Sequence, residues 1–420
     1  MNRISNQMIN NTLIHNLRRH QVEMDQTQDR LSTGKNVRLP RDNPIATGNQ
    51  MLYNSRLTEI KQYVTNIGEG MSRLNEADTA IQSMTRIFHR IRVLTVELAN
   101  GTYSTFERRD AAAVEVNQLL EELVKIGNTS GAMGRPIFGG HQTGSEEIPN
   151  PFVPIYQTFV DGLQGTVITG VEYRGNIGGL MREVGKGEYM SVNVPGNHLF
   201  WATNQILTSN VDSSDYAAAT NQVINIDGLD VNISAGDNLD MIIDKINNTG
   251  LSVRALKGGR NNLILETTSP HQIWLRDNGS GTVLQDLGLI NPDSTEPPNN
   301  FASNATIGGM SIFEAIITIR DDLIRGDIEL IGGRDLGLID MALENILRHQ
   351  TAVGAKESRL DELARRSEYE KTNIYDMIAK TEGIDFPEEI MNLKWLDTVH
   401  QYALAVGARS IKPTLMDFLR

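Results

Sequence analysis

The stretch of this sequence that comes nearest to a chemical motif is Ser32–Lys35. A phosphate-binding loop opens with a glycine and closes with Ser or Thr after the lysine, so that backbone amides, the ammonium group and the hydroxyl surround the phosphates. This chain has Asp29 at the first of these positions and Asn36 at the second. We therefore predict no nucleotide site here.

Metal ligation is also poorly supported by the histidines. The two that are closest in sequence, His15 and His20, have a spacing that places them on different faces of a helix. His349 belongs to a long helical pattern, where packing or solvent exposure is the expected role. The chain has no cysteine, which excludes thiolate ligands, cysteine nucleophiles and disulfides.

The carboxylates outside the helical patterns adjoin Gly, Asn or Pro, where a turn or helix-cap role is usual: Asp227, Asp237, Asp277 and Asp293. No spacing forces two of them together as an acid–base pair. We therefore predict that the chain has no catalytic, cofactor-binding or metal-binding residues, that it needs no cofactor, and that it is not an enzyme.

Composition limits the partners. A formal net charge of -13 disfavours nucleic acid, whose binding depends on Lys and Arg neutralising phosphates. There is no apolar run of about 18 residues that could span a bilayer. Residues 1–10 lack the apolar core of a cleavable secretory signal. We predict neither a nucleic acid nor a membrane partner, while export without such a signal remains open.

Three stretches repeat apolar residues at spacings of three and four, the period of a helix that packs along one seam. They cover residues 74–98, 104–127 and 336–378. The last is far longer than the typical helix of about 11 to 12 residues, which indicates a rod-like bundle or coiled coil.

Both ends of the chain carry a narrower apolar stripe. A single helix with so little to bury is marginal in water and needs a partner helix. We predict that the two ends pair with each other, or with a neighbouring subunit, and that their stripes form an assembly interface: Ile4, Met8, Leu13, Leu17, Met24, Leu31, Ile390, Leu393, Leu396, Val399, Ala403 and Val406.

Residues 141–300 have a different composition, which is rich in Gly, Pro, Asn and β-branched residues. Residues 223–233 alternate apolar and polar side chains around Asp227-Gly228, which predicts a hairpin. A short helix should follow, capped by Asp237 and ended by Gly250. The predicted fold class is mainly α with an inserted α+β, β-rich domain, and the two terminal segments form an elongated helical bundle or coiled coil.

Two separated phrases give the sequence a family resemblance. Residues 30–48 resemble the N-terminal signature of the flagellin family, a helix ending in a turn followed by an acidic-Pro-Ala segment; the turn residues here are Gly34, Asp42, Asn43 and Pro44. Gly34 can end the first helix, and Asn43-Pro44 can start the next. Residues 353–361, 390–406 and 415–420 are similar to the C-terminal helices and apolar tail of that family.

A third phrase points to one branch of the family, the proteins that join hook to filament. Residues 133–140, followed by Asn150-Pro-Phe152, are similar to the pattern of that branch; the matching residues are Gly134, Arg135, Ile137, Phe138 and Gly139. Pro136 departs from it, where an aromatic residue is usual. Residues 222–290, which end in a Leu-Gly-Leu phrase, resemble a small module of flagellin-family inserts.

The resemblance implies three domains: a terminal coiled coil of residues 1–40 with 381–420, a helical core of 41–140 with 301–380, and an inserted domain of 141–300. It implies a structural subunit of the flagellum, secreted by the flagellar export apparatus and assembled as a ring between hook and filament. The implied partners are copies of the chain, the other hook–filament junction protein, flagellin, and an export chaperone with the export apparatus. Flagellin itself, a cytosolic coiled-coil scaffold and an insert-borne enzyme remain alternatives.

Overall fold

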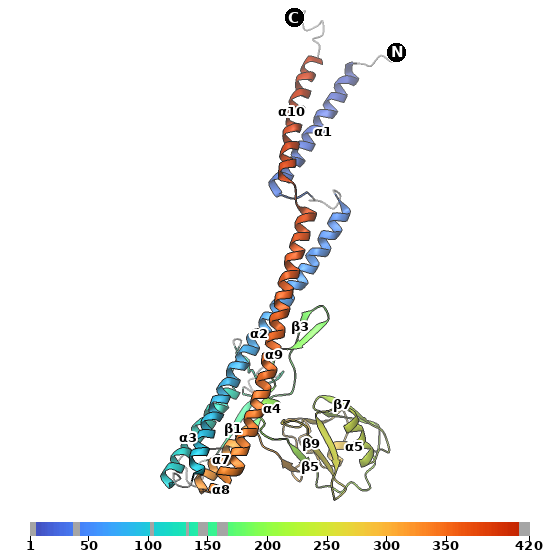
Figure 1. Ribbon diagram of the computed structural model, residues 1–420. Coiled ribbons are helices and arrows are strands. Elements are labelled where there is room, and N and C mark those ends of the chain that lie inside the picture. The colour runs from blue at the N-terminus through green and yellow to red at the C-terminus, as the bar shows by residue number, and fades with distance from the viewer. Residues whose placement is uncertain are drawn as a thin grey trace, which may run out of the picture. The chain divides into compact units, whose positions relative to one another are not determined.

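The computed structural model describes residues 6–36, 43–100, 105–131, 134–141, 150–157 and 167–410. The chain divides into two compact units, here called the terminal unit (Met1–Val64 with Arg365–Arg420) and the middle unit (Thr65–Ala364). Long helices come from both ends of the chain, and small sheets lie between them in sequence (Figure 1). This confirms the predicted fold class.

The terminal unit is a set of paired helices. Helix α1 (Asn6–Thr33) lies antiparallel beside α10 (Phe386–Ser410), and the start of α2 (Pro44–Ala99) lies beside the end of α9 (Leu336–Glu382) (Figure 1). As predicted, Gly34 follows the end of α1 with a φ of 69°, a left-handed conformation that suits glycine. Asn43 caps α2, because its Oδ1 accepts a hydrogen bond of 3.0 Å from the backbone N–H of Ala46.

The core of the terminal unit is small. In the part of this unit that the structure describes, the buried apolar cluster consists of Leu57, Ile60 and Ile374, with Tyr53, Val64 and Ile378 packed against it. Two-helix pairs have little interior, so most of each helix surface faces outward. The helices of this unit therefore leave much apolar surface without a partner inside the chain.

The middle unit has a helical body with a large core. The body contains the remainder of α2 and α9 together with α3 (Phe106–Gly127), α7 (Ile312–Arg325), α8 (Ile328–Leu330) and a π-helical turn (Ile331–Asp335). Two hairpins, β1 (Phe152–Gln157) with β2 (Val167–Tyr173) and β3 (Met181–Gly185) with β4 (Glu188–Ser191), and the short helix α4 (Gly196–Leu199) pack on it. Residues from Phe152 to Ala202 thus contribute to the body core.

A second core belongs to a module that we define as residues 204–309. Three strands pair in the order β10 (Leu275–Asp277), β6 (Gln222–Ile226), β7 (Leu229–Ile233). Four others pair in the order β11 (Thr306–Gly308), β5 (Ile206–Thr208), β9 (Leu263–Thr267), β8 (Val253–Lys257). Helix α5 (Leu239–Asn248; Figure 1) and the short helix α6 (Val283–Asp286) complete the module.

The predicted hairpin is present, with φ values of 50° at Asp227 and 83° at Gly228, as a two-residue turn of the mirror-image type requires. The predicted cap of α5 is wrong. Asn238, not Asp237, caps the helix by accepting from the N–H of Met241 at 3.0 Å. Asp237 instead accepts from the N–H of Ser234 at 2.6 Å and pairs with Lys245. The three-domain division of the sequence stays a prediction.

Candidate assembly interface

The stripe predicted on α1 is only partly covered. Leu13, Leu17, Met24 and Leu31 are half-buried, whereas Met8 is 65% exposed. Ile4 lies outside the described residues. The inner members of the stripe therefore pack, and the outer end of the helix keeps an apolar side chain in solvent.

The stripe predicted on α10 behaves in the same way. Leu396 is buried, and Leu393, Val399 and Ala403 are half-buried, while Ile390 and Val406 are 45% and 60% exposed. The structure thus brings the inner parts of both stripes together along one seam.

The seam is loosely filled toward the chain ends. A cavity of about 360 Å³ lies between α1 and α10 and is lined by Leu13, His20, Val399, Tyr402 and Val406 among others. Gly407 supplies a close contact that the sequence did not reveal, since a Cβ atom there would stand 2.7 Å from Cδ2 of Leu13. The hollow is open to solvent, because Tyr402 and Val406, which line it, are 70% and 60% exposed.

At the other end of the seam, ion pairs and a hydrogen bond join the end of α1 and the turn after it to the end of α9 and the start of α10. Arg30 pairs with Glu389 at 3.2 Å, and Nζ of Lys35 pairs with Glu382 at 2.7 Å. The N–H of Asn36 donates to the carbonyl of Glu382 at 2.7 Å. These contacts therefore hold the turn after α1 in place against the end of α9 and the start of α10. Asp42 lies outside the described residues, and Pro44 is the first residue of α2.

A second apolar face on α10 was missed by the sequence reasoning. Met391, Trp395 and Tyr402 are 65%, 62% and 70% exposed. At about 100° per residue they fall within about 40° of arc, about 100° to 140° around the helix from Leu396. Tyr402 also borders the hollow between α1 and α10. The signal was present in the sequence as spacings of four and seven, but the prediction took a single stripe. Three large apolar side chains are thus exposed on one side of α10.

The phrase at residues 134–139 is mostly internal. Gly134 and Arg135 are exposed, but Ile137, Phe138 and Gly139 are buried in the body. The carbonyl of Phe138 accepts from the N–H of Gly196 at 2.9 Å and from the hydroxyl of Tyr173 at 3.0 Å. The phrase therefore ties its loop to α4 and β2, and its inner residues are packing residues in this structure.

One side-chain cluster has the residue types of a hydrolytic triad. Nε2 of His271 lies 2.9 Å from Oδ2 of Asp227, and Oγ of Ser269 lies 3.4 Å from Nδ1 of His271. Nδ1 also has a shorter contact, 2.7 Å to the carbonyl oxygen of Ser269. The imidazole is wholly buried between two acceptors. This geometry fastens the hairpin turn to the β9–β10 loop and gives a substrate no access to the ring.

The same histidine joins the module to the body. The ring of His198 in α4 lies 4.9 Å from that of His271 and 6.5 Å from that of His349 in α9. Burial, with the nearby His271 second, lowers the pKa of His198 to about 4. Burial, with Arg348 second, lowers the pKa of His349 to about 4. His349 is half-buried in this contact, and the prediction for it was packing or solvent exposure.

Neither metal nor membrane chemistry is suggested by the part of the chain that the structure describes. Across its six described ranges, no group of three or more His, Asp or Glu side chains is placed to hold a metal ion. Among the helices described, none combines the length and apolarity that crossing a bilayer demands.

Comparison with protein families matches both ends of the chain. Residues 4–143 match the bacterial flagellin N-terminal helical region, and residues 336–419 match the bacterial flagellin C-terminal helical region. The two matched regions together hold more than half of the chain, in the order that the family has them.

Curated relatives include filament and hook-associated proteins. Flagellin B of Vibrio anguillarum is 22% identical over 392 residues, 91% of this chain and 90% of that protein. Flagellin of Listeria monocytogenes is 31% identical over 114 residues, 27% of this chain and 39% of that protein. Flagellar hook-associated protein 3 of Escherichia coli is 26% identical over 141 residues, 34% of this chain and 44% of that protein.

Two solved structures have partial similarity to this chain. The flagellar hook-associated protein 3 from Legionella pneumophila is 18% identical, with a TM-score of 0.44, and the match covers 79% of this chain and 97% of that one. A putative flagellar hook-associated protein from Vibrio parahaemolyticus is 13% identical, with a TM-score of 0.48, and the match covers 81% of this chain and 100% of that one.

Proposed function

Because this chain belongs to the flagellin family, we propose that it is a structural subunit of the bacterial flagellum that is assembled as an adaptor ring between hook and filament. The observation that carries the proposal is the exposed apolar face of α10 on a unit whose own core is small. The relative named as a hook-associated protein supports the junction position, as does the phrase at residues 134–139.

Assembly supplies what the terminal unit lacks. Burying Trp395, Met391 and Tyr402 against neighbouring helices would add roughly 25 cal/mol for each Å² of apolar surface removed from water. The loosely filled seam between α1 and α10 would tighten in the same step. Folding of the terminal unit is thus coupled to incorporation, which is how marginal helices gain stability from a partner.

The proposed partners follow from this position: neighbouring copies of the chain, the other hook–filament junction protein, and flagellin. We also propose passage through the flagellar export apparatus with the help of an export chaperone. The chain has no cysteine that could form a disulfide, and the buried core of its terminal unit is small. Both features suit transport in an unfolded state.

We propose that the chain is not an enzyme and uses no cofactor. The support is the triad-like cluster of Asp227, Ser269 and His271, where the imidazole is fully buried and held by a backbone carbonyl. The sequence division into domains at residues 1–40 with 381–420, 41–140 with 301–380, and 141–300 stays a proposal for the number and order of the parts. Its last boundary is narrowed, because Phe152 and Phe200 belong to the body core, and the inserted part proposed to fold by itself is the module of residues 204–309.

A filament subunit is the second candidate. The observation that favours it is the match to Flagellin B, which extends over 91% of this chain. The two candidates share the same helical assembly chemistry and differ in where the subunit sits along the flagellum.

Immunogold electron microscopy of isolated flagella, with an antibody raised against residues 204–309, separates these candidates. We expect label confined to one short band between hook and filament. Label along the whole filament would identify a filament subunit instead. Flagella without label, from cells that produce the protein, would overturn both assignments and favour a cytosolic scaffold.

A further inference from the structure

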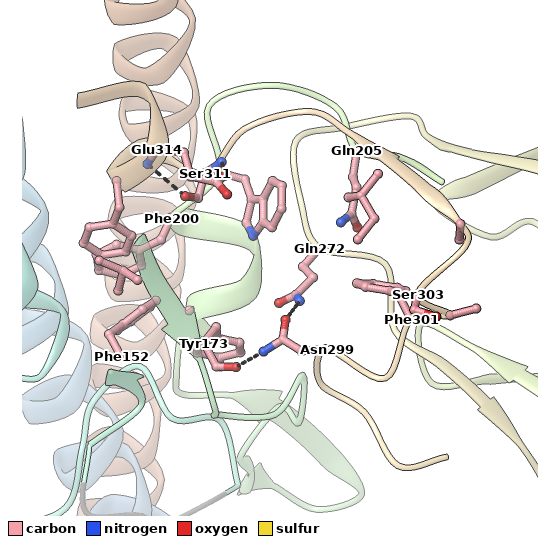
Figure 2. Close-up of a pocket in the computed structure, with 17 residues that line it drawn as sticks. Phe152, Tyr173, Phe200, Gln205, Gln272, Asn299, Phe301, Ser303, Ser311 and Glu314 are labelled. Atoms are coloured by element: carbon pink, nitrogen blue, oxygen red, sulfur yellow. Dashed lines mark hydrogen bonds between the residues drawn. The ribbon is translucent and has the colours of Figure 1, made fainter. Parts of the chain in front are cut away.

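A cavity of about 360 Å³ lies between the body and the module, inside the middle unit. Figure 2 shows Phe152, Tyr173 and Phe200 on the side of the body, with Gln205, Phe301 and Ser303 on the side of the module. Gln272 and Asn299 lie between the two sides. The size is at the lower end of the range for small-molecule pockets, about 300 to 1,000 Å³.

Aromatic rings form the body side of this cavity. Phe152 and Phe200 have ring centroids 4.3 Å apart, and Phe313 lies 5.2 Å from Phe152 and 5.4 Å from Phe200. Trp201 and Phe301 also line the cavity. The faces of such rings carry negative charge density, which attracts the polarised C–H groups of a ligand.

Gln272 presents a fixed hydrogen-bond acceptor. Nδ2 of Asn299 lies 3.0 Å from the carbonyl oxygen of Tyr173, which can only accept, so Oδ1 of Asn299 is the atom that faces Gln272. Gln272 must therefore donate through Nε2, at 2.7 Å. Its Oε1 is left buried and without a hydrogen-bond partner, although the residue is only 4% exposed. A buried acceptor of this kind calls for a donor.

Gln205 presents the complementary donor. Its Oε1 accepts from the backbone N–H of Ile273 at 2.6 Å, which leaves Nε2 as the free end of the carboxamide. The residue is 1% exposed and lines the cavity. One acceptor and one donor thus face the same space from two fixed carboxamides.

The lining selects against charged ligands. Glu314 is the carboxylate among the lining residues, and it is engaged in a capping box with Ser311. Oε2 of Glu314 accepts from the N–H of Ser311 at 2.8 Å, and Oγ of Ser311 accepts from the N–H of Glu314 at 3.1 Å. No Lys or Arg is among the residues described around this cavity.

We propose that this cavity binds a small neutral saccharide of one or two rings. A sugar hydroxyl both donates and accepts, so neighbouring hydroxyls satisfy Oε1 of Gln272 and Nε2 of Gln205 together. The C–H face of the sugar ring packs on the aromatic side. The inference does not depend on where the protein sits in the flagellum.

The test is saturation-transfer NMR on the full chain with D-glucose, D-galactose, N-acetyl-D-glucosamine and maltose, each titrated to about 10 mM. For so small a ligand we expect a Kd of about 1 mM for at least one of them. Gln272→Met keeps the side-chain volume and removes both the Oε1 acceptor and the Nε2 donor to Asn299, so it should weaken binding about tenfold. Ser303→Trp should close the cavity and abolish saturable binding.

Asn304→Trp is the matched control, because Asn304 is exposed, follows Ser303 and does not line the cavity. It should bind the sugar as the unchanged chain does. Circular dichroism checks that all three variants fold. Absence of saturable binding for all four sugars would overturn the proposal, and so would binding that Ser303→Trp leaves intact.

Discussion

His198 and His349 are neutral in the folded protein at pH 7, and their burial makes stability depend on pH. Both have a pKa lowered to about 4, against about 6.5 in an unfolded chain. The unfolded state therefore takes up protons first as the pH falls. Their contribution to stability is fully present above about pH 6.5 and is lost as the pH falls toward 4.

We predict that His198→Gln reduces the loss of stability between pH 7 and pH 4.5 by about 2 to 3 kcal/mol, the linkage value for one such histidine. Denaturant unfolding at the two pH values measures it. His89→Gln is the control, because His89 is exposed on α2. Buried carboxyl groups titrate equally in all variants, so their contribution to the pH dependence of stability cancels when the variants are compared. An acid-induced loss that His198→Gln leaves unchanged would contradict the assignment.

Among the elements, α10 carries one apolar face that packs in the seam with α1 and another that is exposed. Leu396 is 6% exposed in the seam with α1, whereas Trp395 beside it is 62% exposed. Leu396→Asp buries a charge between helices and should lower both the helix content of the free chain and its incorporation into flagella. Trp395→Asp should preserve the circular dichroism spectrum of the free chain and reduce incorporation at least about tenfold.

Tagged variants expressed in motile cells, followed by quantification of the tag in sheared flagella, measure this incorporation. Gln401→Asp serves as the control, since Gln401 is exposed and lies on another side of α10. If Trp395→Asp assembled as well as Gln401→Asp, the outer face of α10 would have no role in assembly.

Elements whose residues repeat with a local period were predictable. The apolar spacing determined α3, α9 and both terminal helices to within a few residues, because 3.6-residue periodicity is a property of the segment itself. For α2 it indicated only residues 74–98, and the start of that helix came from the Asn43-Pro44 turn signal. Asp227-Gly228 predicted its hairpin for the same reason. The cap of α5 was missed because Asp237 and Asn238 are both good capping residues. In the structure the ammonium group of Lys245 pairs with Asp237, and Asn238 caps the helix.

Contacts between distant segments were not predictable. The aromatic cluster gathers Phe138, Phe152, Phe200 and Phe313 from loops and elements far apart in sequence. Arg320 is wholly buried because Asn117 and the carbonyl of Ile168 accept from its guanidinium at 3.0 and 2.7 Å. The sequence shows the neighbouring Asp321, which pairs with Arg320 at 2.8 Å, but gives no sign of the two distant partners, so neither the body core nor the cavity beside it could be derived from the sequence.

At the scale of the whole molecule, the two chain connections between the body and the module lie side by side. The N–H groups of Ala202 and Thr203 donate to the carbonyl of Met310 at 2.9 and 3.2 Å, and the N–H of Met310 donates to Oγ1 of Thr203 at 2.8 Å. Since residues 203 and 310 are adjacent, a linker of two glycines can replace residues 204–309. We predict that this deletion keeps the body folded, with an unfolding temperature within a few degrees of that of the full chain.

Deletion of residues 141–300, the insert expected from the sequence, is the informative comparison. It removes Phe152, Tyr173 and Phe200 from the body core, and the loss of one buried Phe alone costs about 3 to 5 kcal/mol. Thermal unfolding followed by circular dichroism should therefore show a large destabilisation for this deletion and little for the shorter one. Equal stability of the two deletions would mean that the strands and loops of residues 150–202 do not support the body. The shorter deletion would also remove the module side of the saccharide cavity, so it should lose sugar binding while remaining competent to assemble.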